Sequence, residues 1–162
     1  MERFGIRVNK ESFNFASGHF LIFADGTREE LHGHNYRVSV EVEGELDPSH
    51  IVLDFRTFKP IVKRLCDAFD HRVLLPAENP LLKIESRDGN WMVVFGGETM
   101  SFPLRDAVSL PVANISAELL ARHLWGQIKE EILRCFPQAH LTRMEVGVEE
   151  GPGQMAFYSR EL

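Results

Sequence analysis

An α+β fold is predicted by three features of the sequence. Apolar and polar residues alternate with a period of two early in the chain and again near its end, which is typical of half-buried antiparallel strands. Two segments between them carry apolar residues at helical spacing. The 162 residues contain no internal repeat, low-complexity tract or Pro/Gly/Ser linker. We therefore expect one domain over residues 1–162, with helices packed on one face of an antiparallel sheet.

The first two strands are predicted over Arg7–His19 and His32–Gly44, with a polar turn at residues 25–27 between them. Successive side chains of a strand point to opposite faces. In the first strand, one face carries Phe13, Phe15, Ser17 and His19. In the second strand, the apolar face carries Tyr36, Val38, Val40 and Val42. Each strand therefore has one face suited to a core.

The first helix is predicted after Asp54, a favourable N-cap residue. Its apolar stripe consists of Phe55, Phe58, Val62, Leu65 and Phe69. Pro60 has no N–H to donate to a helical hydrogen bond. We therefore expect the helix to begin later, near Thr57, or to kink.

An insertion over about residues 84–112 separates the two helices and contains a small hairpin at Trp91–Phe102, with Gly96-Gly97 as its turn. The second helix is predicted from Ser116, its N-cap, to about Phe136. Its apolar stripe consists of Leu120, Leu124, Ile128 and Ile132.

The last long strand is predicted to begin near Thr142, and it places Met144, Val146 and Val148 on one face. A final short strand is predicted from about Met155 to Tyr158.

Composition excludes several classes of protein. The net charge is −6 and the basic residues are scattered among acids, so no nucleic-acid partner is expected. No apolar run is long enough for a membrane helix, and no signal peptide is visible at residues 1–10. Two cysteines, Cys66 and Cys135, cannot form a disulfide framework and are interpreted as inert thiols. A cytoplasmic location is therefore expected.

Three of the seven histidines fall on inward strand faces. His32 and His34 are two residues apart and share the apolar face of their strand, while His19 continues the phase of Phe13 and Phe15. Neutral imidazole is a good Zn²⁺ ligand, and three ligands leave one position open. The triplet therefore predicts a metal site, although each histidine taken alone is more often a satisfied core or edge residue.

Glu150 is the next residue in the inward phase of Met144, Val146 and Val148. A carboxylate there is costly unless it meets a partner, so it is a candidate to bind a ligand through paired N–H donors. The alternative is a solvated turn residue before Gly151.

Further acid–base candidates lie outside the strands. Asp70 and His71 close the first helix, where an acid can orient and charge an imidazole, although a histidine at a helix C-terminus also favours the helix dipole. Glu29 and Glu30 precede the histidine pair and are either solvated loop residues or a general base beside a metal-bound substrate.

The sequence resembles the 6-pyruvoyl-tetrahydropterin synthase family, which includes the bacterial 6-carboxy-tetrahydropterin synthases. The resemblance rests on segments in the same order along nearly the whole chain: Phe15–His19, Leu31–Tyr36, Asp70-His71 and Val148–Glu150. The run His-Gly-His-Asn-Tyr, with a histidine upstream of it, is its most specific part.

The resemblance implies a tunnelling fold, in which four antiparallel strands and two helices form a subunit, three subunits close a barrel and two trimers stack into a homohexamer. It also implies active sites at subunit interfaces, Zn²⁺ bound by His19, His32 and His34, and a pterin ring anchored by Glu150. Asp70 and His71 would be a proton relay, and the substrate would be 7,8-dihydroneopterin triphosphate.

One departure from the family pattern changes the expected reaction. The best-known members carry a catalytic cysteine shortly before the His-Gly-His run, whereas residues 25–31 contain none. Arg28–Leu31 instead resembles a glutamate-type branch, with Glu29 in place of the cysteine, and residues 101–106 also resemble that branch. Its members cleave the substrate side chain to give 6-hydroxymethyl-7,8-dihydropterin, a folate precursor.

Three functions remain open at this point. The first is this zinc-dependent carbon–carbon cleavage, with Glu29 as base. The second is formation of 6-pyruvoyl- or 6-carboxy-tetrahydropterin, for biopterin or queuosine synthesis, against which the missing cysteine argues. The third is a pterin- or metal-binding module without turnover, which has less use for the Asp70-His71 relay.

Overall fold

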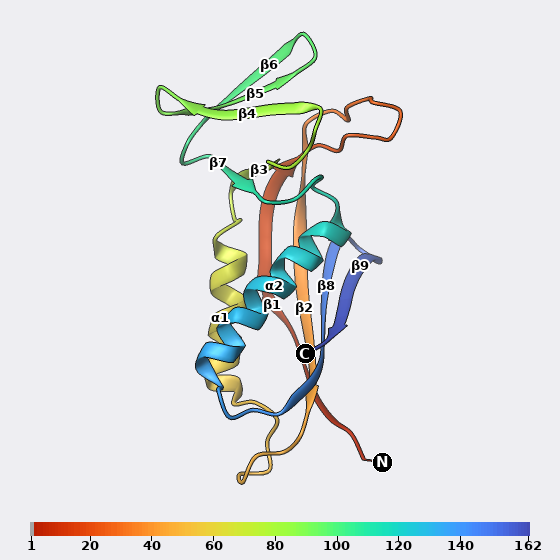
Figure 1. Ribbon diagram of the computed structural model, residues 1–162, viewed down its shortest axis with the longest axis vertical. Helices are drawn as coiled ribbons and strands as arrows, with labels where there is room; N and C mark the ends of the chain where they lie inside the picture. The colour runs from red at the N-terminus through yellow and green to blue at the C-terminus, as the bar shows by residue number, and fades with distance from the viewer. Residues whose placement is uncertain (1) are drawn as a thin grey trace.

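Long antiparallel strands dominate the computed structural model, which describes residues 2–162 (Figure 1). In chain order the elements are β1 (Phe4–His19), β2 (His32–Gly44), α1 (Phe55–Asp67), β3 (Arg72–Pro76), β4 (Leu82–Arg87), β5 (Asn90–Phe95), β6 (Glu98–Pro103), β7 (Ala107–Leu110), α2 (Ala117–Cys135), β8 (Leu141–Gly151) and β9 (Gln154–Glu161). The class is α+β, as predicted.

The main sheet has six strands in the order β7-β3-β1-β2-β8-β9. Its four predicted strands, β1, β2, β8 and β9, pair with one another in antiparallel fashion. The expectation of only four strands is wrong, because β3 pairs in parallel with the end of β1 and β7 pairs in parallel with β3. These added strands span five and four residues, and their burial does not alternate, so a period of two does not identify them.

Helix α1 begins at Phe55, directly after its N-cap Asp54, whose side chain accepts a hydrogen bond from the Arg56 N–H at 2.8 Å. The expected later start is therefore wrong, and Pro60 lies inside the helix. Pro60 is exposed, so its ring displaces no core side chain and its direct cost is the lost backbone hydrogen bond. Phe55 is exposed too, contrary to its place in the predicted stripe.

Both helices lie across the same face of the long strands (Figure 1). The main core fills the space between them, and its members come from α1, α2 and the inward faces of β1, β2 and β8. Ser116 caps α2 as predicted, accepting from the Leu119 N–H. None of the helices in residues 2–162 is long and apolar enough to cross a membrane.

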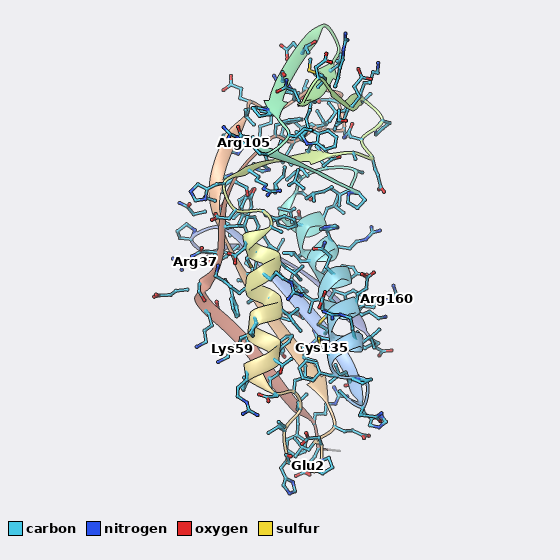
Figure 2. All side chains as sticks on the ribbon, turned by 90° about the vertical axis from the view of Figure 1, so that its left-hand side faces the viewer. Glu2, Arg37, Lys59, Arg105, Cys135 and Arg160 are labelled. Atoms are coloured by element: carbon cyan, nitrogen blue, oxygen red, sulfur yellow. The ribbon has the colours of Figure 1, made fainter. Side chains whose placement is uncertain are left out.

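The opposite face of the main sheet is charged. Arg37 extends from it, away from the helices (Figure 2). Ion pairs join neighbouring strands on this face, including Arg7–Glu41 and Arg143–Glu43. The sheet is therefore apolar on the helix side and polar on the other.

The insertion between the helices forms a second, three-stranded sheet in the order β4-β5-β6 at one end of the molecule (Figure 1). The predicted hairpin and its Gly96-Gly97 turn are present as β5 and β6, whereas β4 was not predicted. A second apolar cluster joins this sheet to the main one, and its buried members are Phe20, Ile22, Leu75, Val93 and Ala107.

Candidate metal centre and active site

The three predicted histidines lie together where β1 ends and β2 begins. His19 and His32 are register partners of the two strands, and His34 follows on the same face of β2. The Nε2 atoms of His19 and His32 lie 3.2 Å apart, and those of His32 and His34 lie 2.9 Å apart. Strand phase thus places three imidazoles around one point.

Backbone carbonyls orient two of these rings. His19 Nδ1 lies 2.8 Å from the Ile115 oxygen, and His32 Nδ1 lies 2.9 Å from the Glu30 oxygen. A carbonyl only accepts, so each Nδ1 carries the proton and each Nε2 lone pair points into the cluster. Burial lowers the pKa of His19, which favours the neutral form that binds metals.

Converging Nε2 lone pairs are unfavourable without a cation between them. The ligand atoms of His19, His32 and His34 lie within 4.8 Å of one another, which fits a metal ion held by three nitrogens. The residues present therefore can hold a metal ion.

Glu150 lies inside β8, and its carboxylate faces the histidine cluster. Its Oε1 is 3.3 Å from His19 Nε2 and 3.5 Å from His34 Nε2, and it accepts a hydrogen bond from the Tyr36 hydroxyl at 3.3 Å. Burial, reinforced by the nearby Glu150 charge, raises the pKa of Tyr36, so the phenol stays protonated as a donor. The alternative of a solvated turn residue does not hold.

A pocket of about 360 Å³ continues from Glu150, between the start of α2 and the β8–β9 turn. Its lining residues are Leu21, Ser116, Ala117, Glu118, Glu150, Gln154, Met155 and Ala156. Ser116 was predicted only as the N-cap of the second helix, and Glu118 follows it in the first turn. Their place beside Glu150 depends on how α2 docks on the sheet, which no local pattern reveals.

Glu29 lies close to the three histidines, beside the Nδ1 atom of His32. Its Oε2 accepts a hydrogen bond from the Leu21 N–H at 3.1 Å and lies 3.9 Å from His32 Nδ1. Glu30 contributes its backbone carbonyl, which orients the His32 ring. The two adjacent glutamates therefore have different surroundings.

Asp70 and His71 pair with each other in the turn between α1 and β3, with 2.9 Å between Asp70 Oδ2 and His71 Nδ1. Asp70 Oδ1 accepts from the Ala16 N–H, and this bond is the main cause of the lowered pKa of Asp70. His71 has a φ of 58° and an 84 % exposed side chain.

Within residues 2–162, no hydrogen bond or ion pair joins Asp70 or His71 to the three histidines. His71 and His34 do line one open pocket of about 480 Å³. The three histidines, Glu150 and Glu29 are thus brought together in one chain, whereas the Asp70-His71 pair makes no direct contact with the histidines and shares only this open pocket with His34.

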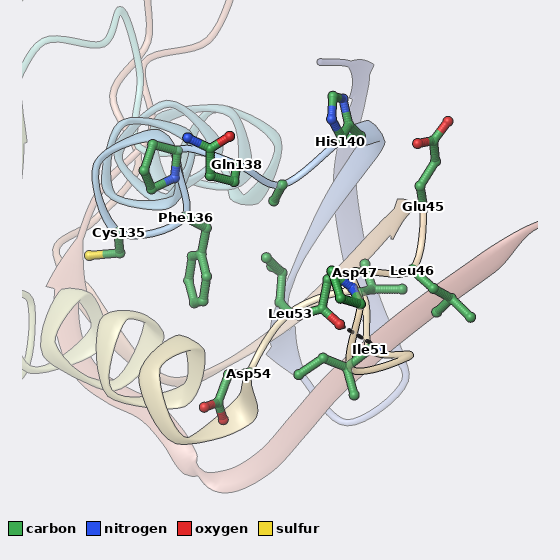
Figure 3. A pocket seen from close by; sticks show the side chains of 14 residues that line it. Glu45, Leu46, Asp47, Ile51, Leu53, Asp54, Cys135, Phe136, Gln138 and His140 are labelled. Atoms are coloured by element: carbon green, nitrogen blue, oxygen red, sulfur yellow. Dashed lines mark hydrogen bonds between the residues drawn. The ribbon is translucent and has the colours of Figure 1, made fainter.

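A pocket of about 490 Å³ lies elsewhere, between the loop before α1 and the segment after α2 (Figure 3). Cys135 and His140 line it, together with Glu45 and Asp54. It contains none of the predicted site residues. Both cysteines are free, and burial raises the pKa of Cys66 to about 12, as expected of an inert thiol.

Residues 7–161 match the family described as 6-pyruvoyl tetrahydropterin synthase. A putative 6-carboxy-5,6,7,8-tetrahydropterin synthase of Methanocaldococcus jannaschii is 33 % identical over 149 residues, which cover 91 % of this chain and 90 % of the relative. The 6-carboxy-5,6,7,8-tetrahydropterin synthase of Haemophilus influenzae is 30 % identical over 130 residues, or 77 % of this chain and 83 % of the relative.

Solved structures agree with the sequence relatives. The 6-pyruvoyl tetrahydropterin synthase of Plasmodium falciparum superposes with a TM-score of 0.93 at 32 % identity, and that of Plasmodium vivax with 0.92 at 33 %. Each comparison covers 100 % of both chains. The fold is therefore the expected tunnelling fold, and the chain is an enzyme of the 6-pyruvoyl tetrahydropterin synthase family.

Proposed function

We propose that this enzyme is a zinc-dependent lyase that cleaves the side chain of 7,8-dihydroneopterin triphosphate to give 6-hydroxymethyl-7,8-dihydropterin. The observation that carries the proposal is one cluster containing three metal-binding imidazoles, an inward carboxylate and a second carboxylate. Family membership supplies the class of reaction, a pterin synthase or lyase. The particular product and the identity of the metal are proposed in addition to what family membership supplies.

Zinc is proposed because the ligand set consists of three neutral nitrogens, an arrangement that suits a catalytic Zn²⁺ site with one open position. When bound, zinc would lower the pKa of a substrate hydroxyl and polarise the developing carbonyl. His19, His32 and His34 would hold it.

The pterin ring is proposed to bind in the pocket beside Glu150. A carboxylate can accept two parallel hydrogen bonds from adjacent N–H donors, as a pterin presents. The Tyr36 hydroxyl donates a hydrogen bond to the Glu150 carboxylate, while Leu21 and Met155 supply apolar walls for the ring. The side chain of the substrate would then extend toward the histidines.

Glu29 is proposed as the general base. It would take the proton from a side-chain hydroxyl as the adjacent carbon–carbon bond breaks, and a proton would then return to the carbon left on the pterin. A catalytic glutamate has a parallel in a relative, since one solved Plasmodium vivax structure is a variant in which a glutamate described as a catalytic residue is replaced by alanine.

The Asp70-His71 pair is proposed as the second proton carrier. Its position fits a site completed by a neighbouring subunit of a homohexamer, because His71 is exposed in the isolated chain and shares an open pocket with His34. A cytoplasmic location is proposed as well, since both cysteines are free.

A second candidate is 6-carboxy-tetrahydropterin synthesis, because two of the curated relatives above carry that name. Formation of 6-pyruvoyl-tetrahydropterin is the corresponding alternative from the structural relatives. The absence of a cysteine from residues 25–31 separates this chain from the cysteine-dependent pattern of both reactions.

Mass spectrometry after incubation of the zinc-loaded protein with 7,8-dihydroneopterin triphosphate distinguishes these functions. We expect 6-hydroxymethyl-7,8-dihydropterin as the main product. A 6-carboxy or 6-pyruvoyl product would replace the proposed reaction with the corresponding alternative. No low-molecular-weight product at all would leave a binding module.

The two adjacent glutamates can be separated by single substitutions. Glu29→Gln keeps the hydrogen-bond acceptor but cannot take a proton, so we expect kcat to fall by about 10²-fold or more. Glu30→Gln leaves the backbone carbonyl that orients His32 and should reduce kcat far less. Full turnover by the Glu29→Gln enzyme would exclude Glu29 as the base, and selective loss in the Glu30→Gln enzyme would assign that role to Glu30.

A further inference from the structure

We propose that Arg28 is a positioning residue that fastens the Glu29 loop to the three-stranded β4-β5-β6 sheet, so that this insertion forms part of the active-site framework. The proposal rests on the proposed role of Glu29 as base. It assigns a function to a sheet that carries none of the metal, pterin or proton-relay candidates.

Arg28 contacts three parts of the molecule at once. Its Nη1 donates to the backbone oxygen of Glu29 at 2.8 Å, and its Nη2 donates to Glu98 Oε2 at 2.8 Å. The guanidinium carbon lies 5.6 Å from the centre of the Phe20 ring, within range of a cation–π interaction. One side chain thus joins the Glu29 loop, the start of β6 and the residue after the ligand His19.

The loop that carries Glu29 has a fixed register of its own. Ile22 and Arg28 form a β-bridge, and the Phe23 N–H donates to the Thr27 oxygen at 2.8 Å. The Glu29 N–H donates to the Leu21 oxygen at 2.8 Å, while the Leu21 N–H donates to the Glu29 carboxylate. The position of this carboxylate therefore follows the position of the small hairpin over residues 21–29.

The insertion provides the surface against which that hairpin rests. Phe20 and Ile22 are buried in the same apolar cluster as Val93 of β5. Glu98 begins β6, directly after the Gly96-Gly97 turn. The apolar contacts hold the base of the hairpin, and the Arg28–Glu98 pair is the ionic contact between the Glu29 loop and this sheet.

Arg28 is the enclosed member of this ion pair. Its side chain is 18 % exposed, whereas that of Glu98 is 65 % exposed, and the buried Arg28 Nε has no partner within residues 2–162. A largely desolvated guanidinium with an unmade hydrogen bond is costly to keep. The two hydrogen bonds that it does make join the Glu29 backbone to Glu98, and we call this Glu29–Arg28–Glu98 connection the clamp.

Four single variants test the clamp in the zinc-loaded full chain with 7,8-dihydroneopterin triphosphate as the probe. Arg28→Met removes both hydrogen bonds, Arg28→Lys keeps the charge but cannot form both bonds with the same fork, and Glu98→Gln removes the charge of the partner. Glu85→Gln is the matched control, because Glu85 pairs with Lys83 in the same sheet and contacts no loop residue through that pair. For each we would measure kcat, KM, bound metal and melting temperature.

A displaced base should lower kcat while leaving substrate and metal binding intact. We expect Arg28→Met to reduce kcat at least about tenfold, because a shift of about 1 Å can cost about 10²-fold. Its KM and its metal content should stay within about twofold of the wild-type values. Arg28→Lys should restore part of the loss, Glu98→Gln should lower kcat by about two- to fivefold, and Glu85→Gln should match the wild type.

Two results would overturn the proposal. One is an unchanged kcat in the Arg28→Lys and Glu98→Gln enzymes, which remain informative even where Arg28→Met does not fold. The other concerns Arg28→Met: its melting temperature or metal content falls, but kcat per folded, metal-loaded chain is unchanged. Arg28 would then have a structural role only. Glu29→Gln distinguishes failure of the proposed base from failure of the proposed positioning role. If Glu29→Gln keeps full turnover, Glu29 is not the base. If Glu29→Gln is inactive while Arg28→Lys and Glu98→Gln are fully active, only the positioning role of Arg28 is rejected.

Discussion

His32 is the central member of the histidine cluster, because its Nε2 lies 3.2 Å from that of His19 and 2.9 Å from that of His34. His32→Ala leaves two ligands, too few for a tetrahedral site. We expect bound zinc, measured by atomic emission after dialysis, to fall from about one equivalent to about a tenth of one. His140→Ala is the control, since His140 lines the separate pocket of Figure 3, and equal zinc in both variants would rule out the cluster as the metal site.

His123 should make stability depend on pH. Burial lowers its pKa below the ordinary 6.5, and its buried Nε2 has no hydrogen-bond partner within residues 2–162. The unfolded chain therefore binds a proton first as the pH falls, and stability present above pH 6.5 is lost from there down toward the folded pKa. Glu78 and Arg122 line the same pocket.

His123→Leu removes this titration at similar side-chain volume. We expect the variant to lose less melting temperature than the wild type between pH 7.5 and pH 5.5, with a chelator present so that metal release does not contribute. An equal loss in both proteins would show that His123 does not govern the acid sensitivity.

Single residues of the site were predictable where strand phase decides direction. His19, His32, His34 and Glu150 all follow from a period of two, because the face of a strand is fixed by its hydrophobic residues. The neighbours Ser116, Glu118 and Arg28 were not assigned to the site, since their contacts connect segments far apart in the chain. The position of Asp70 and His71 relative to the three histidines was not predicted for the same reason, because these segments are far apart in the chain.

At the scale of elements, length and surroundings decided what the sequence could reveal. Strands β1, β2 and β8 are long and half-buried, so their alternation is clear. Strands β3 and β7 exist because parallel pairing beside the end of β1 stabilises short segments that have no pattern of their own. The capping residues of both helices were recognisable because capping is a local interaction.

The contribution of the Asp54 cap of α1 to the stability of the protein can be measured. Its side chain accepts from the Arg56 N–H at 2.8 Å, and Asp54→Ala leaves that donor without its partner. We expect the free energy of unfolding, measured by urea denaturation, to fall in the Asp54→Ala protein. Asp54→Asn should keep most of the cap, and Asp67→Ala, which removes only an exposed ion pair with Lys63, should cost less. A larger loss from Asp67→Ala than from Asp54→Ala would reverse this ranking.

At the scale of the whole molecule, the main sheet has open edges that suit assembly. Strand β9 ends the sheet, and β1 pairs with β3 only at Ser17 and Gly18, which leaves its first half open on that side within the described chain. An edge strand is a template for pairing with another chain. The charged, helix-free face would then line the inside of a closed ring of subunits.

Phe157 tests this arrangement, because it lies on β9 and is 63 % exposed in the isolated chain. Its register partner is Gly147, so its side chain lies on the helix-free face beside the proposed contact between edges. A lysine there adds a charge next to that contact, so we expect Phe157→Lys to lower the mass in light scattering from about six times the 18.5 kDa chain to that of smaller species. Leu133→Lys is the matched control, since Leu133 is 60 % exposed and lies on helix α2, not on an edge strand. If only Leu133→Lys dissociates the protein, the helices and not the edge strands form the contact. If the Phe157→Lys protein does dissociate, its kcat should fall as well, because the proposed second proton carrier, His71, would no longer lie beside the three histidines of a neighbouring subunit.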